Sequence, residues 1–307
     1  MRGRSGPLRL RHRVLEVVRA HGLWSPGDAL TVACSGGRDS VVLLDLLVQT
    51  QRAHGAELSV VTVDHGQRPG SAADASFVAD RAASYGLPCE VRVVACGPSE
   101  AELRAARHGV FAERVAAGQR VALAHHRQDQ AETLLLQVLR GTGSAGRRGM
   151  WWAREGLVRP LLDTPPQQLA AWADARGLTW REDPTNQAPR YLRNRVRQEL
   201  LPLLENLRPG AMGALARSAR HAAVDDQHLA ELAAAAAVEH VSAEGVSTVW
   251  VAEGPEALVR RVLLARWPDL GAGGIDALRA AARRGRGRVR LGGGGTVVVD
   301  PGWCQVD

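Results

Sequence analysis

The sequence predicts an α/β protein in which helices cover both faces of a parallel sheet, followed by a smaller, mainly helical C-terminal domain. Over residues 1–205, short apolar runs without polar alternation alternate with segments whose apolar residues have helical spacing. This pattern is typical of parallel strands buried between helices. Residues 206–307 are instead rich in alanine and end in a short strand-rich tail. The length of 307 residues allows two domains of about 150 residues each. We therefore expect domains at 1–205 and 206–307, with the boundary near 205–209.

The elements follow in order along the chain. In the first domain the apolar runs predict strands at 30–34, 58–63, 89–94, 121–124 and 158–162. Helical spacing predicts helices at 8–23, 41–55, 72–85, 100–117, 128–139, 165–176 and 190–204. In the second domain we expect one or two helices within 209–241, shorter helices at 256–267 and 275–284, and a strand pair around a glycine turn in 286–307. Open parallel sheets bind ligands beyond the carboxyl ends of their strands.

Charge and composition exclude several classes of chemistry. The chain has 39 basic and 32 acidic residues, a formal net charge of +7, and none of the basic residues is lysine. The absence of lysine rules out a Walker A lysine, a kinase strand lysine and a Schiff-base lysine. The positive balance suits an anionic partner, although it is also common among proteins without one.

Cysteine usage and hydropathy indicate a reducing compartment. Cys34, Cys89, Cys96 and Cys304 form no CxxC pair and have no metal-ligand spacing, so we expect thiols, with Cys34 in the core. No apolar run reaches the ~18 residues that a membrane helix needs, and the arginine-rich start lacks the apolar core of a signal peptide. We therefore expect a cytoplasmic protein.

A candidate phosphate loop follows the first predicted strand and opens a helix, with the residues Ser35, Gly36, Gly37, Arg38, Asp39 and Ser40. Glycines allow positive φ and close backbone approach, and successive amides at a helix start form an anion cradle. Asp39 would repel a polyphosphate unless it held a Mg²⁺ ion that bridges phosphate oxygens. The alternative is a tight turn with a serine or aspartate cap, but all six positions together favour phosphate binding.

This segment resembles the SGGxDS signature of the PP-loop pyrophosphatase family, a Rossmann-like (HUP-like) group of ATPases. Members cleave ATP between the α and β phosphates and leave an adenylated carbonyl oxygen. The resemblance implies ATP and Mg²⁺ as cofactors, with Asp39 as the metal ligand. It places ATP contacts at Ser35, Gly36, Gly37, Arg38, Asp39, Ser40, His65 and His125. The neighbouring His126 could also contact the nucleotide, and for both histidines the alternative is a packed, hydrogen-bonded strand end.

Further motifs narrow the resemblance. They read VDHGQRP at 63–69, AHHRQDQAET at 124–133, RGTG at 140–143, RPLL at 159–162, EDPTN at 182–186 and YLRNRVR at 191–197. In this order and with these gaps they resemble the tRNA(Ile)-lysidine synthase family, in its short form, over about residues 10–205. That family uses ATP to adenylate the C2 oxygen of the wobble cytidine in a CAU anticodon, then joins free lysine to C2 and releases AMP and pyrophosphate. The resemblance therefore implies tRNA(Ile) and L-lysine as partners, an adenylation domain followed by a C-terminal tRNA-binding domain, and leaves a homodimer open.

Two carboxylates are candidates for binding and moving protons. Asp129 and Glu132 are three apart on a predicted helix and share a face, where they could hold an ammonium group or Mg²⁺, and one could accept a proton. The alternative is a solvated acidic helix start that complements the helix dipole. The resemblance implies that both recognise lysine and act in catalysis with Asp39. Gln128 replaces an aspartate that the family usually has, which puts metal binding at this position in doubt.

Several arginines are candidates for binding substrate. Arg190, Arg193 and Arg197 share one helical face, and the resemblance implies that Arg193 and Arg197 hold the lysine carboxylate or a phosphate. The alternative is a surface face paired to acids such as Glu199, four residues after Arg195.

The resemblance also carries tRNA contacts. It assigns them to Arg104 and Arg107, although His108 stands where the family has tyrosine, and to Arg140, at the start of a loop (141–149) that could equally be a linker. Arginines of the C-terminal helices could read tRNA shape or be ordinary solvated surface: Arg217, Arg220, Arg260, Arg261, Arg283 and Arg284. Two other functions remain open: a PP-loop enzyme that adenylates a different carbonyl, and an RNA-binding protein that has lost turnover.

Overall fold

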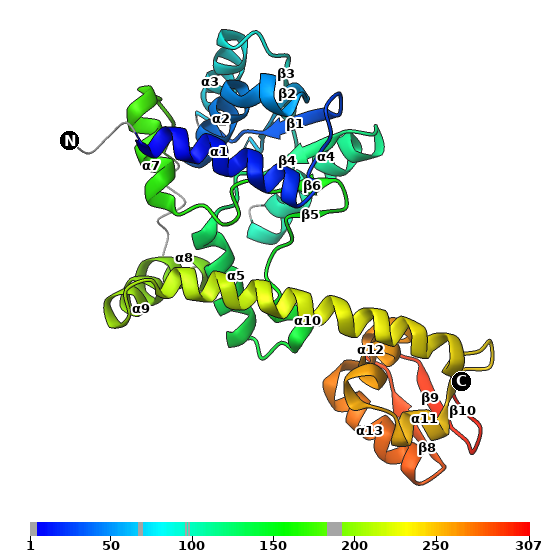
Figure 1. The fold of residues 1–307 in the computed structure, drawn as a ribbon. Coiled ribbons are helices and arrows are strands. Elements are labelled where there is room, and N and C mark those ends of the chain that lie inside the picture. Colours follow the sequence, from blue (N-terminus) through cyan, green and yellow to red (C-terminus); the bar gives the residue numbers. More distant parts are fainter. Residues whose placement is uncertain (1–4, 67–69, 96, 98, 183–191) are drawn as a thin grey trace. The chain divides into compact units, whose positions relative to one another are not determined.

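The computed structural model describes residues 5–66, 70–95, 97, 99–182 and 192–307. The chain forms two compact units, Met1–Arg220 and His221–Asp307, and each is described by itself (Figure 1). No helix in the described part of the chain is both long and apolar enough to cross a membrane.

The first unit is built on a six-stranded sheet with the order β3-β2-β1-β4-β6-β5. Its strands are β1 (Ala29–Ala33), β2 (Glu57–Asp64), β3 (Cys89–Val93), β4 (Arg120–Ala122), β5 (Ala153–Arg154) and β6 (Leu157–Val158). All pairs are parallel except β5 with β6. The chain builds outward from β1 to β3 and then returns to place β4 on the other side of β1. The strand order therefore reverses between β1 and β4, the place where open α/β sheets form their ligand crevice.

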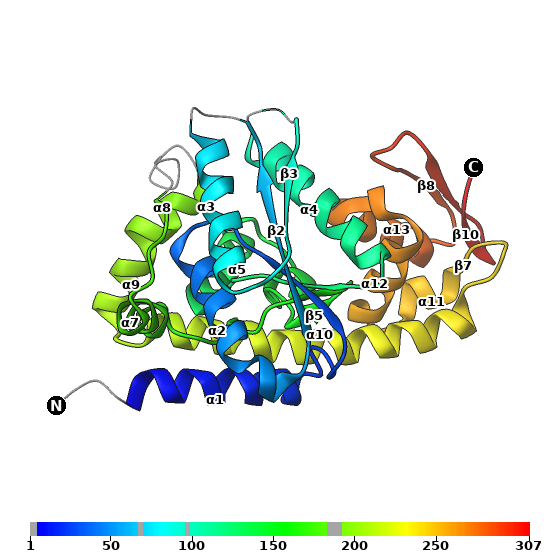
Figure 2. The same cartoon turned by 90° about the horizontal axis from the view of Figure 1, so that it is seen from above.

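Helices cover both faces of this sheet, as the sequence predicts. Side chains of β1 and β2 that point to one face, such as Leu30, Val32 and Val60, share a buried cluster with α1 (Ser5–Ala20), α2 (Arg38–His54), α3 (Ser71–Ser84) and α7 (Pro166–Arg176). Side chains of opposite parity, such as Val61 and Val121, pack with Val110 and Phe111 of α4 (Glu100–Ala116). Figure 2 shows α2 and α3 on one side of β2 and β3 and α4 on the other.

A buried carboxylate ties α2 to α7. Asp45 of α2 is 0% exposed and accepts hydrogen bonds from Trp172 Nε1 (2.8 Å), Tyr85 Oη (2.8 Å) and Arg176 Nε (3.2 Å). Burial, together with the hydrogen bond to Asp45, raises the pKa of Tyr85 to about 12. Because the carboxylate is fully partnered, it is tolerated inside the core that supports the sheet.

The last helices of the first unit differ from the single helix predicted over 190–204. The structure has α8 (Leu192–Arg195), a π-helical turn at Val196–Leu200 and α9 (Leu201–Leu207), while residues 183–191 lie outside the described part. Pro202 lacks the N–H that a regular helix would use, and Leu201 N donates to Val196 O, five residues back. The helix α5 (Arg127–Leu139) matches its prediction closely, and α6 (Ser144–Arg147) interrupts the predicted 141–149 loop.

The second unit combines helices with an antiparallel sheet. Its elements are the end of α10 (Ala211–His240), β7 (Val246–Ser247), α11 (Thr248–Glu253), α12 (Glu256–Arg266), a 3₁₀ turn (Pro268–Leu270), α13 (Gly271–Arg283), β8 (Gly287–Arg290), β9 (Thr296–Val299) and β10 (Trp303–Val306). The sheet order is β7-β10-β9-β8, so the predicted strand pair is part of a larger sheet. The units meet inside α10, further along the chain than 205–209, because Met212 and Leu215 pack with Leu201 in a cluster of the first unit.

Candidate active site

The loop Ser35–Ser40 joins β1 to α2 at the point where the strand order reverses. Gly36 has a φ of +83°, a left-handed conformation that favours glycine. A Cβ on Gly36 would lie 3.4 Å from a methyl of Val78 and 3.7 Å from the Phe77 ring. The Gly36 carbonyl accepts a hydrogen bond from Arg181 N at 2.9 Å. Contacts with α3 and with Arg181 therefore hold this turn in place, and Gly36 contributes no side chain to it.

The start of α2 has the features of an anion site. Ser40 Oγ donates to the Gly37 carbonyl (2.8 Å) and accepts from Ser35 N (3.2 Å), which closes the loop on itself. Gly37 is the N-cap residue, and no side-chain hydrogen bond caps the helix. The amides of its first turn therefore still need acceptors, and the positive end of the helix dipole favours an anion there. These residues fit a nucleotide phosphate group.

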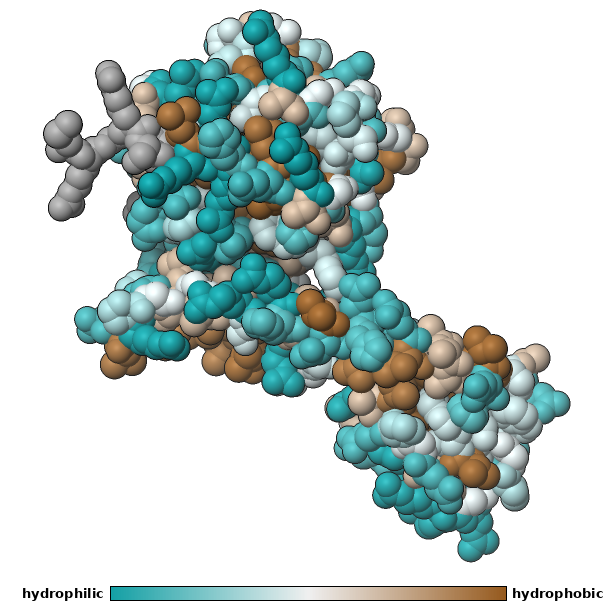
Figure 3. Space-filling view, in the orientation of Figure 1, coloured by the Kyte–Doolittle hydropathy of each residue, from teal (hydrophilic) through white to brown (hydrophobic). Residues whose placement is uncertain are grey.

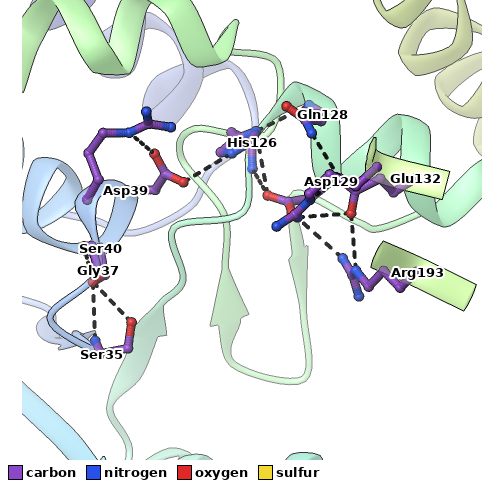
Figure 4. Close-up of polar contacts among 11 residues, drawn as sticks. Ser35, Gly37, Asp39, Ser40, His126, Gln128, Asp129, Glu132 and Arg193 are labelled. Carbon is purple, nitrogen blue, oxygen red and sulfur yellow. Dashed lines mark hydrogen bonds and ion pairs between the residues drawn. The ribbon is translucent and has the colours of Figure 1, made fainter. Parts of the chain in front are cut away.

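His126 lies between the loop and α5 (Figure 4). Its Nε2 is 3.3 Å from Asp39 Oδ2, and its Nδ1 accepts from Gln128 N at 3.2 Å. The backbone N–H of His126 donates to Asp129 Oδ2 at 2.9 Å. One residue thus contacts an aspartate of the phosphate loop and an aspartate of α5. From the sequence, His126 is expected, like His125, either to contact the nucleotide or to pack at a strand end, and its contacts with the two aspartates are not foreseen.

The charges around His126 shift both partners. Burial lowers the pKa of His126, but the hydrogen bond with Asp39 and the charge of Asp129 outweigh it, so the pKa is raised. Burial raises the pKa of Asp39, but the hydrogen bond and charge of His126 and the charge of Arg38 bring it below its usual value. Arg38 Nε donates to Asp39 Oδ1 at 3.0 Å. Asp39 therefore lies between the guanidinium of Arg38 and the imidazole of His126.

Asp129 and Glu132 of α5 form a buried carboxylate pair. They are 9% and 0% exposed, so the alternative of a solvated helix start is wrong. Arg197 donates to Glu132 Oε1 (Nε, 2.6 Å) and to Asp129 Oδ1 (Nη2, 3.0 Å), and Arg193 donates to Glu132 Oε2 (Nε, 3.2 Å). Gln128 Nε2 donates to Glu132 Oε1 at 3.1 Å. The residue that departs from the family pattern is thus a hydrogen-bond donor to Glu132.

The ion pairs between α5 and the two arginines join residues that were expected to bind different groups of the substrate. Asp129 and Glu132 were expected to hold an ammonium group, and Arg193 and Arg197 a carboxylate or phosphate. In this structure the four side chains bind one another. Arg195 pairs with the exposed Glu199 at 3.2 Å, as the surface alternative has it, and Arg190 lies outside the described residues.

A second group of basic side chains, His125 and Arg159, lies beside the carboxylate pair. Burial lowers the pKa of His125 to about 3, against the charge of Asp129, and the charge of Arg159 lowers it further. Burial and the charge of Arg104 lower the pKa of Arg159 to about 10. His125 Nδ1 and Arg159 Nε are buried and have no hydrogen-bond partner within the described ranges. Arg159 belongs to the RPLL motif at 159–162, and the sequence alone predicts no role for it.

The remaining predicted site residues lie further out or are not described. Arg104 and Arg107 are exposed on α4. Arg140 follows the last residue of α5, about 16 Å along the helix axis from Asp129. Burial lowers the pKa of His65, aided by the charge of Arg107. Cys96, residues 67–69 and residues 183–191 of the quoted motifs lie outside the described part, and Cys34, Cys89 and Cys304 are free.

Asp39 is the carboxylate of the phosphate loop that could hold a metal ion. Among the residues that the structure describes, no group of three or more His, Cys, Asp or Glu side chains could hold a metal ion by itself. Mg²⁺ commonly binds one or two carboxylates together with substrate phosphates. Asp39 fits a magnesium site that is completed by substrate phosphates. Its carboxylate must first be released from Arg38 or His126.

The fold and the phosphate loop define a PP-loop domain, and the family model of that description matches residues 9–204. The tRNA(Ile)-lysidine synthase of Geobacter sulfurreducens is 42% identical over 246 residues, which cover 74% of this chain and 52% of that protein. The tRNA(Ile)-lysidine synthase of Salinispora tropica is 39% identical over 326 residues and 95% of each chain. The chain belongs to the tRNA(Ile)-lysidine synthase family.

The lengths of the relatives differ. The chain spans about half the length of the curated relatives that match it over 72–74% of its own residues. Among solved structures, a U34-tRNA thiolase from Methanococcus maripaludis has a TM-score of 0.58 and 15% identity, covering 70% of this chain and 77% of that chain. At that identity the likeness shows the fold alone, and it agrees with the α/β class predicted from the sequence.

Proposed function

We propose that this protein uses ATP to join free L-lysine to C2 of the wobble cytidine in the CAU anticodon of a minor isoleucine tRNA. The observation that supports it most is His126, which contacts Asp39 of the phosphate loop and Asp129 of the carboxylate pair. A ligase of this type must hold a nucleotide and an amine next to the same base. The contacts of His126 support this, because they link the phosphate loop to the carboxylate pair.

The loop Ser35–Ser40 binds the triphosphate in this proposal, through the uncapped amides at the start of α2. His65 and His125 lie near the nucleotide, and Asp39 holds Mg²⁺. The ion would neutralise charge on the phosphates as pyrophosphate leaves. Adenylation of the C2 oxygen makes it a leaving group, and attack of the lysine ε-amine on C2 then releases AMP.

Asp129 and Glu132 bind the ε-ammonium group of lysine and accept the proton that must leave before the amine can attack. Both carboxylates are buried, so their attraction to an ammonium is screened less than at the surface. They are bound to Arg193 and Arg197 in the described structure. Lysine therefore enters by exchange with a guanidinium group, which is then free to bind the lysine carboxylate.

The RNA contacts follow the family pattern. Arg104, Arg107 and Arg140 bind tRNA in this proposal. The first two are exposed on α4, and the charge of Arg104 acts on the half-buried Arg159. A cytoplasmic location, where tRNA and free lysine meet, goes with this function.

The test is a reconstituted reaction with ATP, Mg²⁺, free lysine and a CAU-anticodon tRNA. The mass of the anticodon fragment should increase by that of one lysine less one water, and AMP and pyrophosphate should appear together. Asp39→Ala should abolish the product, whereas Asp80→Ala, an exposed carboxylate of α3, should leave it unchanged. Full activity of Asp39→Ala would contradict the metal assignment.

Two results would replace the proposal. Pyrophosphate release that does not depend on RNA would favour a PP-loop enzyme with a small-molecule carbonyl as its substrate. Tight tRNA binding without any use of ATP would favour an RNA-binding protein without turnover.

A further inference from the structure

Gln128 lies in the first turn of α5, one turn before Glu132 (Figure 4). Its side-chain Nε2 donates to Glu132 Oε1 at 3.1 Å. The other side-chain donors to this carboxylate are guanidinium nitrogens: Arg197 Nε at 2.6 Å and Nη2 at 3.0 Å, and Arg193 Nε at 3.2 Å. Within the described part of the chain, each oxygen of Glu132 therefore has two donors, and Gln128 supplies the one donor that carries no charge.

The charges of the ion pairs at this site balance as long as position 128 is neutral. The two carboxylates of α5 carry two negative charges, and the guanidinium groups of Arg193 and Arg197 carry two positive charges. A buried charge is tolerated when it is paired and hydrogen-bonded. A carboxylate at position 128 would add a third negative charge beside Glu132, which is 0% exposed, and no third guanidinium among the described residues pairs with the site to offset it.

His126 does not change this balance. Its ring lies between Asp129 (Nδ1 to Oδ2, 3.6 Å) and Asp39 (Nε2 to Oδ2, 3.3 Å). The backbone N–H of Gln128 donates to Nδ1 at 3.2 Å, so Nδ1 acts as an acceptor and the ring proton lies on Nε2, facing Asp39. With that tautomer the imidazole is neutral, and the two arginines alone balance the carboxylate pair.

We propose that Gln128 makes the carboxylate pair selective for an organic ammonium group over a divalent metal ion. The inference rests on the proposed function, and it chooses between the two ligands that the spacing of Asp129 and Glu132 allows, an ammonium group and Mg²⁺. An ammonium group that replaces one guanidinium leaves the net charge of the site unchanged. A divalent ion in the same place adds an excess positive charge, which no third carboxylate offsets.

The amide of Gln128 also opposes a metal ion directly. Its N–H points at Glu132 Oε1, so the positive end of the N–H dipole faces an oxygen that a metal ion would need. A rotated amide would present its oxygen to another acceptor, so the carboxylate selects the N–H orientation. Mg²⁺ requires oxygen ligands in near-octahedral geometry at about 2.0–2.1 Å, and an amide N–H cannot serve as one of them.

Gln128 has a second role in the exchange of a guanidinium for an ammonium group. Arg197 donates to both oxygens of Glu132, so its departure leaves that carboxylate with two of its four donors. Gln128 remains in place, because it lies on the same helix, four residues before Glu132. The amide keeps Oε1 hydrogen-bonded until the ammonium group arrives, which makes Gln128 a positioning residue.

Binding of Mn²⁺, a spectroscopic substitute for Mg²⁺, tests the selectivity without tRNA, lysine or ATP. Gln128→Glu keeps the length of the side chain and adds the third carboxylate. Electron paramagnetic resonance of free Mn²⁺ should show one more bound ion per chain in this variant than in the wild type. The control is Gln167→Glu, at an exposed position of α7, and it should bind Mn²⁺ as the wild type does. Hydrophilic residues predominate on the surface over α1 and α7 (Figure 3), so an added charge there is solvated.

Lysine kinetics in the complete reaction give a second readout. With ATP saturated by Mg²⁺, the KM for lysine should rise in proportion to free Mg²⁺ in Gln128→Glu, because the ion competes for the carboxylates. The wild-type KM should not depend on free Mg²⁺. Gln128→Ala removes the donor without adding charge, so it should raise the lysine KM about tenfold, with kcat unchanged and no dependence on free Mg²⁺. A side chain that only stabilised the fold would not separate the two variants in this way.

Three results would overturn the inference. The first is Mn²⁺ binding to the wild type that Glu132→Gln abolishes, because the pair would then hold a metal ion beside Gln128. The second is equal Mn²⁺ binding by the wild type and Gln128→Glu, and the third is equal behaviour of Gln128→Ala and Gln128→Glu in both assays. A wild type that forms no product from lysine would instead contradict the proposed function, and the Mn²⁺ measurement does not depend on that result.

Discussion

Arg197 joins both carboxylates of α5, with its Nε 2.6 Å from Glu132 Oε1 and its Nη2 3.0 Å from Asp129 Oδ1. Glu132 is 0% exposed, and a carboxylate at that depth is tolerated because donors surround it. The contact also ties the π-helical turn that carries Arg197 to α5. Any amine that binds Glu132 must compete with a group that is already in place.

Glu132→Gln tests whether this carboxylate recognises lysine. The variant loses a charged partner for the ammonium group, an interaction of about 1.5–3 kcal/mol, so the KM for lysine should rise about 100-fold while the ATP Kd stays the same. Initial rates of AMP release against lysine concentration measure this. Glu199→Gln, at an exposed ion pair, is the matched control. An unchanged lysine KM would remove Glu132 from the amine site.

Gly36→Ala tests the phosphate turn. An alanine at a φ of +83° is strained, at a cost of about 1–2 kcal/mol, and its Cβ would lie 3.4 Å from Val78. The free energy of unfolding should fall by about 1 kcal/mol, and ATP affinity should fall with the change in backbone. Urea titration and calorimetry measure the two effects. Gly37→Ala has an ordinary φ of −70° and should unfold at the wild-type midpoint.

His125 predicts a loss of stability in acid. Its folded pKa of about 3 lies below the usual 6.5, so the unfolded chain binds the proton more readily. The stability contribution is therefore complete above pH 6.5 and is lost as the pH falls toward 3, by about 2 kcal/mol at pH 5. His125→Asn should lose that much less stability between pH 7 and pH 5 than the wild type, as measured by urea unfolding. The control is His228→Asn, at an exposed position of α10, and a matching pH dependence in both variants would contradict the burial of His125.

Asp45→Ala should destabilise the first unit without touching the site. Trp172 Nε1 and Tyr85 Oη would lose their acceptor in the core, at a cost of about 3 kcal/mol. The free energy of unfolding measured in urea should show this loss. Asp45→Asn, which keeps an acceptor oxygen, should cost less, and Asp174→Ala on the exposed side of α7 should stay within about 0.5 kcal/mol of wild type. Equal effects of the alanine changes at 45 and 174 would show that the buried network does not stabilise the fold.

Most of the fold could be predicted because its signals are local. The strands 30–34 and 58–63 agree with β1 and β2 to within one residue, and the helix 41–55 agrees with α2 except that α2 begins three residues earlier. The predicted strand 158–162 is wrong beyond Val158, because Pro160 has no N–H to donate to a ladder. The π-helical turn before Pro202 could not be predicted either. The periodicity of apolar side chains indicates a helix but does not show which carbonyl each N–H bonds to.

The part of the site that depends on residue spacing along a single helix could be predicted. Asp129 and Glu132 share a helix face, and the structure confirms that they form a pair. Their neutralisation by Arg193 and Arg197 was not predictable, because it depends on how α8 and the π-helical turn pack on α5, more than 60 residues later in the chain. The bridge through His126 depends on β1 and β4 being neighbours, which strand spacing alone does not show.

Cys34 directly follows β1 and is 2% exposed, with Sγ 3.6 Å from Ser40 Oγ. Burial raises the pKa of its thiol, so a sulfhydryl reagent can modify it only during transient local opening. The rate at which Cys34 is alkylated therefore measures how often the Ser35–Ser40 turn opens, and no label has to be introduced into the protein.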